Sequence, residues 1–139
     1  MASNEEIQSL FEQFKKAYNR LKEAIVIKDE SDIKRDAVIK RFEFTYELLW
    51  KTYKKIARSQ KLDFFNPKAC FQFAFKSGLI EDEALFLEII DARNKTTHVY
   101  SEEEAQKIYE FVKKKAINAF DAAEKKLEEM GIVGNRLYE

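Results

Sequence analysis

The sequence has few of the residues that end helices. Only three Gly and one Pro occur among 139 residues, whereas 45% of the residues are hydrophobic and 36% are charged. Turn-rich sheet proteins need Gly and Pro at many positions, so this composition favours long helices. A chain of this length fits one domain, which should bury about two thirds of the surface that its unfolded chain exposes. We therefore expect a single all-α domain over residues 1–139.

Cysteine and long apolar runs are also scarce. The single Cys70 lies among Phe71, Phe73 and Phe75, so it cannot form a disulfide within the chain, and we interpret it as a small packing residue. No apolar run approaches the roughly 20 residues that span a bilayer, and the first residues lack the basic and apolar regions of a signal peptide. These absences predict a cytoplasmic protein that does not enter a membrane.

The chain has no excess charge of either sign, since 25 Lys and Arg balance 25 Asp and Glu. A neutral chain has no overall field to hold a polyanion, so any RNA contact must be a local patch. Aromatic residues, in contrast, are abundant, with 12 Phe, 6 Tyr and 1 Trp. Such a surplus can form an exposed patch of the kind that marks an interface, and we therefore expect a homodimer.

Apolar residues recur at three- and four-residue spacing in four long segments, which predicts four long helices. The first should follow a capping box at Ser3–Glu6, and the second should run from about Ile33 to Ser59. The third long helix should span about Asp82–Thr97. The last should begin at a capping box at Ser101–Glu104.

A fifth, shorter helix is expected to open at Asn66-Pro67 and to end at Gly78. The corners between helices are short, so neighbouring helices should be antiparallel. The sequence therefore predicts an antiparallel up-and-down four-helix bundle with one extra short helix. Residues 131–139 have no apolar stripe that could dock, and we expect them to form a flexible tail.

Arg93 follows the inward apolar stripe of the helix expected at Asp82–Thr97. It lies four residues after Ile89 and so points inward, where a guanidinium needs a carboxylate, a carbonyl or a bound phosphate. His98 lies five residues later, about 140° further around an uninterrupted helix. The two side chains can face one ligand only if the helix loosens at Thr96-Thr97 or if a second subunit supplies the matching half.

Arginine and histidine together suit metal-free RNA cleavage, in which a 2′-hydroxyl attacks the adjacent phosphate. Histidine can move a proton near neutral pH, and arginine offers a planar donor fork to the phosphate as negative charge accumulates. Asn94 and Thr97 can orient the substrate or the imidazole. The structural alternatives remain open, because a lone histidine at a helix corner is more often a capping or packing residue and an inward arginine often belongs to an ion pair.

A second group of cationic residues lies near the start of the helix expected at Ile33–Ser59. Arg35 and Arg41 lean toward its apolar arcs and are candidates for substrate binding, although salt bridges to Asp36 or Glu43 would serve equally well. With one His and one Cys in the chain, we expect no metal site and no cofactor.

Two segments resemble a known family. The first has the Arg-x4-His-x-Tyr signature of HEPN-domain proteins and reads Arg93-Asn94-Lys95-Thr96-Thr97-His98-Val99-Tyr100. The second, residues 35–51, resembles the HEPN branch of nucleotidyltransferase substrate-binding proteins. This branch is similar to the helical domain of kanamycin nucleotidyltransferase and is typically paired with a separately encoded minimal nucleotidyltransferase. The resemblance covers roughly residues 5–130 and implies a HEPN-like dimer with such a partner.

The resemblance also implies two possible functions. In related HEPN toxins the motif arginine and histidine form a metal-independent endoribonuclease site at the dimer cleft, and the partner silences the toxin by adenylylating the motif tyrosine. Carried over, Arg93 and His98 are the catalytic residues, Tyr100 is the modification site, and the chain is the toxin half of a toxin-antitoxin pair. The alternative is a non-catalytic subunit that binds a nucleotide or another substrate for the transferase.

Overall fold

The computed structural model of the chain describes residues 4–29, 31–99 and 101–131, which contain helices and no strand. The predicted all-α class is confirmed. The helical elements are α1 (Asn4–Val26), α2 (Asp32–Ser59), α3 (Pro67–Lys76), α4 (Glu83–Thr96), α5 (Glu102–Phe111), the π-helical turn η1 (Val112–Ala116) and α6 (Ile117–Glu129). The capping box predicted at Ser3 lies outside the described residues, as does all of the predicted tail except Gly131.

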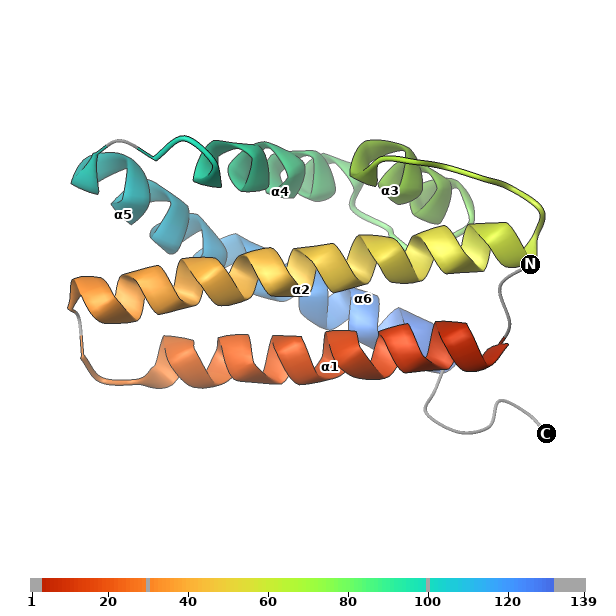
Figure 1. The fold of residues 1–139 in the computed structure, drawn as a ribbon, viewed down its shortest axis with the longest axis horizontal. Coiled ribbons are helices and arrows are strands. Elements are labelled where there is room, and N and C mark those ends of the chain that lie inside the picture. Colours follow the sequence, from red (N-terminus) through yellow and green to blue (C-terminus); the bar gives the residue numbers. More distant parts are fainter. Residues whose placement is uncertain (1–3, 30, 100, 132–139) are drawn as a thin grey trace.

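The two longest helices, α1 and α2, lie side by side and run in opposite directions (Figure 1). The last helical segment, α5 to α6, packs against α1 and α2, whereas α3 and α4 lie along another side of α2 (Figure 1). Helix α2 therefore has neighbours on several sides, as its mostly apolar circumference predicts. None of the helices in the described ranges is long and apolar enough to cross a membrane.

The helix starts at Asn66 and Ser101 agree with the predicted capping chemistry. A side-chain oxygen accepts a hydrogen bond from the amide three residues later at Ser31, Asn66, Asp82 and Ser101. These bonds satisfy backbone donors that the first turn of a helix leaves without a partner. Gly78 closes α3 with a φ of +80°, a conformation that residues with a side chain rarely adopt.

The last predicted helix is not regular throughout. A π turn, Val112–Ala116, separates α5 from α6, where the sequence predicts one continuous α-helix. A π turn widens a helix locally without ending it, so hydrophobic spacing alone does not reveal it. Both Val112 and Ala116 remain fully buried, and the lysines between them stay toward the outside. The interruption therefore preserves the core.

Aromatic rings form the centre of the core, where α6 meets α1 and α2. The ring centroid of Phe120 lies 6.2 Å from that of Phe14, 6.0 Å from that of Tyr18 and 6.1 Å from that of Phe42. All four side chains are buried. Such pairs stabilise the fold beyond the simple burial of apolar surface. Cys70 is also fully buried, in agreement with its predicted packing role, and burial raises the pKa of its thiol to about 11.

Phe120→Ala should lower the free energy of unfolding by about 3–5 kcal/mol, because it leaves a cavity among three other rings. Phe44→Ala is the matched control, since Phe44 is 60% exposed, and it should change stability by no more than about 0.5 kcal/mol. Urea denaturation followed by circular dichroism measures both. Equal losses for the two variants would contradict the described core.

Candidate functional site

The corner at the end of α4 holds Arg93 against α2. Arg93 Nη1 donates a hydrogen bond to Thr96 Oγ1 at 3.1 Å and lies 3.7 Å from Glu43 Oε2. Thr96 Oγ1 in turn donates to the Arg93 carbonyl oxygen at 2.7 Å. The side chain of Arg93 is 30% exposed, and its Nε is buried without a hydrogen-bond partner among the described residues. The guanidinium is thus only partly satisfied by the protein and keeps a side open to solvent.

A buried tyrosine of α2, Tyr46, is close enough to Arg93 to feel its charge. The positive charge of Arg93 acts on the Tyr46 hydroxyl and lowers its pKa, but burial has the larger, opposite effect and raises that pKa to about 12. Tyr46 therefore remains a neutral phenol at physiological pH. The sequence identified neither Tyr46 nor Glu43 as a neighbour of Arg93, because the packing of α4 against α2 depends on residues far apart in the chain.

His98 lies beyond the last turn of α4. The helix ends at Thr96, Thr97 caps it, and the backbone N–H of His98 donates to the Lys95 carbonyl oxygen at 3.1 Å. The imidazole is exposed and lines a groove of about 530 Å³ between α4 and α5. Arg93 does not line this groove. Within one chain, the structure therefore does not bring the two predicted catalytic side chains into the same pocket.

The groove beside His98 carries balanced charge. Three lysines and three carboxylates line it: Lys95, Lys107, Lys115, Glu88, Asp91 and Glu104. Lys95 Nζ lies 3.1 Å from Asp91 Oδ2, and Lys115 Nζ lies 3.5 Å from Glu88 Oε1. A groove in which lysines already face carboxylates attracts an anion only weakly.

Two predicted supporting residues belong to the end of α4 itself. Asn94 and Thr97 are both exposed. The carbonyl oxygen of Asn94 accepts a hydrogen bond from Thr97 Oγ1 at 3.0 Å, so this hydroxyl helps to close the helix. The Asn94 side chain remains on the surface near the corner. Tyr100, the predicted modification site, lies outside the described residues.

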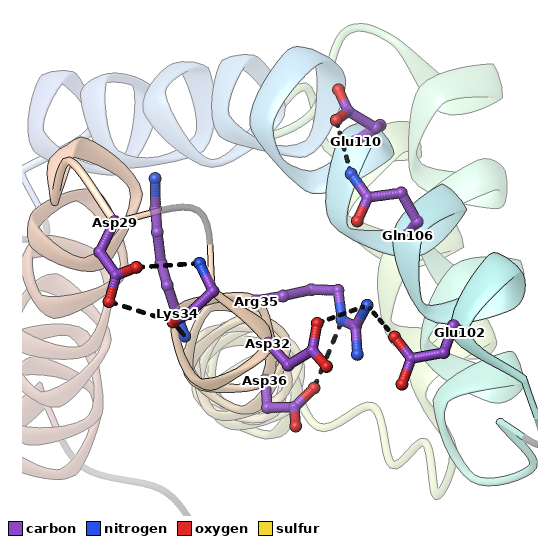
Figure 2. Close-up of polar contacts among 9 residues, drawn as sticks. Asp29, Asp32, Lys34, Arg35, Asp36, Glu102, Gln106 and Glu110 are labelled. Atoms are coloured by element: carbon purple, nitrogen blue, oxygen red, sulfur yellow. Dashed lines mark hydrogen bonds and ion pairs between the residues drawn. The ribbon is translucent and has the colours of Figure 1, made fainter.

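Arg35 occupies an ion-pair cluster that connects α2 to α5 (Figure 2). Its Nη1 donates to Glu102 Oε1 at 2.9 Å and lies 3.4 Å from Asp32 Oδ1, and its Nε lies 3.5 Å from Asp36 Oδ1. The side chain is only 10% exposed. The hydrogen bond to Glu102 is the main cause that raises the pKa of Arg35. The structural alternative therefore describes Arg35 better than substrate binding does.

Arg41 lies elsewhere on α2, on the side that faces α1. Its Nη1 donates to the backbone carbonyl oxygen of Arg20 at 2.8 Å. The side chain lines a groove between α1 and α2, whereas Arg93 contacts α2 from α4. Arg35, Arg41 and Arg93 are thus presented at three separate places. In the described parts of the chain, no three His, Cys, Asp or Glu side chains form a group that could hold a metal ion.

Arg35→Gln should lower the free energy of unfolding by about 1–2 kcal/mol, because it removes one charged hydrogen bond and two ion pairs to carboxylates that are themselves largely exposed to water. Lys40→Gln is the control, since the Lys40 side chain is 73% exposed, and it should change stability by less than about 0.5 kcal/mol. Thermal and urea unfolding measure the difference. If Arg35→Gln leaves stability unchanged, Arg35 has no structural role.

The family comparison agrees with the resemblance noted in the sequence. The family described as "Nucleotidyltransferase substrate binding protein like" matches residues 9–129. The chain belongs to this family. No curated protein matches the sequence.

Two solved structures are similar to this family member. One is a protein from Thermus thermophilus, with 32% sequence identity and a TM-score of 0.71, and the match covers 84% of this chain and 98% of that one. The other is a tri-AMPylated Shewanella oneidensis HEPN toxin in complex with MNT antitoxin, with 16% identity and a TM-score of 0.72 over 88% and 96% of the two chains. At 16% identity the likeness concerns the fold, which is that of a HEPN protein.

Proposed function

We propose that this chain is the helical partner of a separately encoded minimal nucleotidyltransferase. In this proposal the chain forms a homodimer of up-and-down four-helix bundles and is the toxin half of a toxin-antitoxin pair. The toxin cleaves RNA without a metal. The observation that carries the proposal is the incompletely satisfied guanidinium of Arg93, five residues before an exposed His98. The family match and the likeness to a HEPN toxin bound to an MNT antitoxin support the choice of partner.

The arrangement of the two side chains favours a site shared between subunits. Arg93 contacts α2, whereas His98 lines the groove beside α5. Two chains related by a twofold axis at this corner would pair Arg93 of one subunit with His98 of the other. Each dimer would then carry two such sites.

The proposed reaction needs only these side chains and the RNA itself. Neutral His98 takes the proton of a ribose 2′-hydroxyl, whose oxygen attacks the adjacent phosphorus. Arg93 binds the phosphate oxygens, for which its contact with Glu43 at 3.7 Å is a weak competitor. The bond to the 5′-oxygen breaks, and the imidazolium returns a proton to that oxygen. The products are a 2′,3′-cyclic phosphate and a 5′-hydroxyl.

Adenylylation of Tyr100 would silence this site through charge and bulk. An AMP group there would stand two residues from His98 and add a phosphate that competes with RNA for Arg93. The nucleotidyltransferase partner would supply the AMP from ATP and release pyrophosphate. Modification of Tyr100 would thus be the step by which the nucleotidyltransferase regulates the toxin.

Arg93→Gln and His98→Ala should each reduce RNA cleavage by about 10²–10⁴-fold, because one removes the phosphate ligand and the other the proton carrier. The measurement is cleavage of labelled RNA by the purified dimer in EDTA. Asn94→Ala is a milder comparison at the same corner and should reduce cleavage less. Intact RNA with the unmodified wild-type dimer would contradict the proposal.

The family description favours a second candidate, a subunit that binds substrate for the transferase without cleaving anything. In that case Arg93 would bind a nucleotide and His98 would be dispensable. Calorimetry with ATP, in the presence and absence of the transferase, separates the two candidates. Nucleotide affinity that depends on Arg93, together with intact RNA, would establish the binding subunit.

A further inference from the structure

A groove of about 540 Å³ runs between α1 and α2 on the side away from the core. Its apolar floor consists of Ala17 on α1 and of Ala37, Phe44 and Leu48 on α2. Phe44 is 60% exposed, which is unusual for a phenylalanine in the middle of a helix. The three α2 residues lie at helical spacing, so they form one stripe along the groove.

Four cationic side chains line this groove, namely Lys16, Arg20, Lys40 and Arg41, and none of the described carboxylates does. Within the described part of the chain, Lys16, Arg20 and Arg41 take part in no ion pair. The hydrogen bond from Arg41 to the Arg20 carbonyl oxygen fixes one guanidinium at the groove. A chain with no net charge therefore has a local basic patch here, in contrast to the groove beside His98, where lysines and carboxylates balance.

We propose that the groove between α1 and α2 binds single-stranded RNA. A basic groove that contains an exposed aromatic ring suits this ligand, because phosphates meet the cations while a base stacks on the ring. A second copy of the chain fits less well, since it would bring the same four cations against each other if the two grooves met. Single-stranded RNA would thus contact both the exposed Phe44 ring and the cations of the groove.

One carboxylate connects this groove to the candidate catalytic corner. Glu43 Oε1 lies 3.6 Å from Lys40 Nζ, and Glu43 Oε2 lies 3.7 Å from Arg93 Nη1. Lys40 lines the groove, so one cation of the groove and Arg93 contact the same carboxylate of α2. This part of the inference rests on the proposed function, in which Arg93 binds the scissile phosphate. The groove would then hold the RNA beside the cleavage site.

Fluorescence anisotropy with a labelled 2′-O-methyl RNA of about 12 nucleotides tests the groove, because this RNA lacks the attacking hydroxyl and cannot be cleaved. The double variant Lys16→Gln/Arg20→Gln should weaken binding about tenfold and reduce the slope of log affinity against log salt by about 1.4. Phe44→Ala should weaken binding about tenfold through loss of stacking.

Matched controls separate the groove from general charge and aromatic content. Lys68→Gln/Lys76→Gln removes two cations from α3, and Phe65→Ala removes a ring that is 74% exposed outside the groove. Both controls should bind RNA as the wild type does. Circular dichroism checks that all variants fold.

Several results would overturn the groove proposal. One is equal binding by the groove variants and the wild type, and another is equal weakening by the controls. A shift from dimer to monomer in the groove variants, seen by light scattering, would instead assign the groove to a second copy.

Groove-dependent binding without any RNA cleavage would contradict only the proposed function. Cleavage with an unchanged KM in the groove variants would contradict only the groove.

Discussion

The end of α4 at Thr96 is the constraint on which the candidate site depends. Up to this residue the helix holds Arg93 against α2, and after it the chain turns so that His98 lines the groove beside α5. Thr96 also donates to the Arg93 carbonyl oxygen and accepts from its guanidinium. One side chain therefore closes the helix and orients the arginine.

The two partly buried arginines of α2 and α4 differ in how well the protein satisfies them. Arg35 has three carboxylates within 3.5 Å, whereas Arg93 has one at 3.7 Å, and in both side chains the Nε is buried without a hydrogen-bond partner in the described residues. A cation that the protein leaves partly unsatisfied is available to a phosphate, and one with three carboxylates is not. Under the proposed function, this difference in carboxylate contacts distinguishes Arg35, which has a structural role, from Arg93, which binds the phosphate.

Helical periodicity and capping residues predicted the helices well, since both depend on residues close in sequence. The starts at Asn66 and Ser101 are examples. The π turn after Phe111 and the contact of Arg93 with Glu43 were not predictable, because they depend on how α2, α4 and α5 pack together. The sequence also ranked Arg35 and Arg41 together, but packing gives the first an ion-pair cluster and the second a place in a basic groove.

The central claim is that one catalytic site takes Arg93 from one subunit and His98 from the other. Mixing the Arg93→Gln and His98→Ala proteins, after exchange of subunits, tests it most directly. About half of the dimers would then be mixed and would carry one intact site, so RNA cleavage should return to about one quarter of the wild-type rate. If the mixture stays as inactive as either variant alone while subunit exchange is complete, the shared site is contradicted.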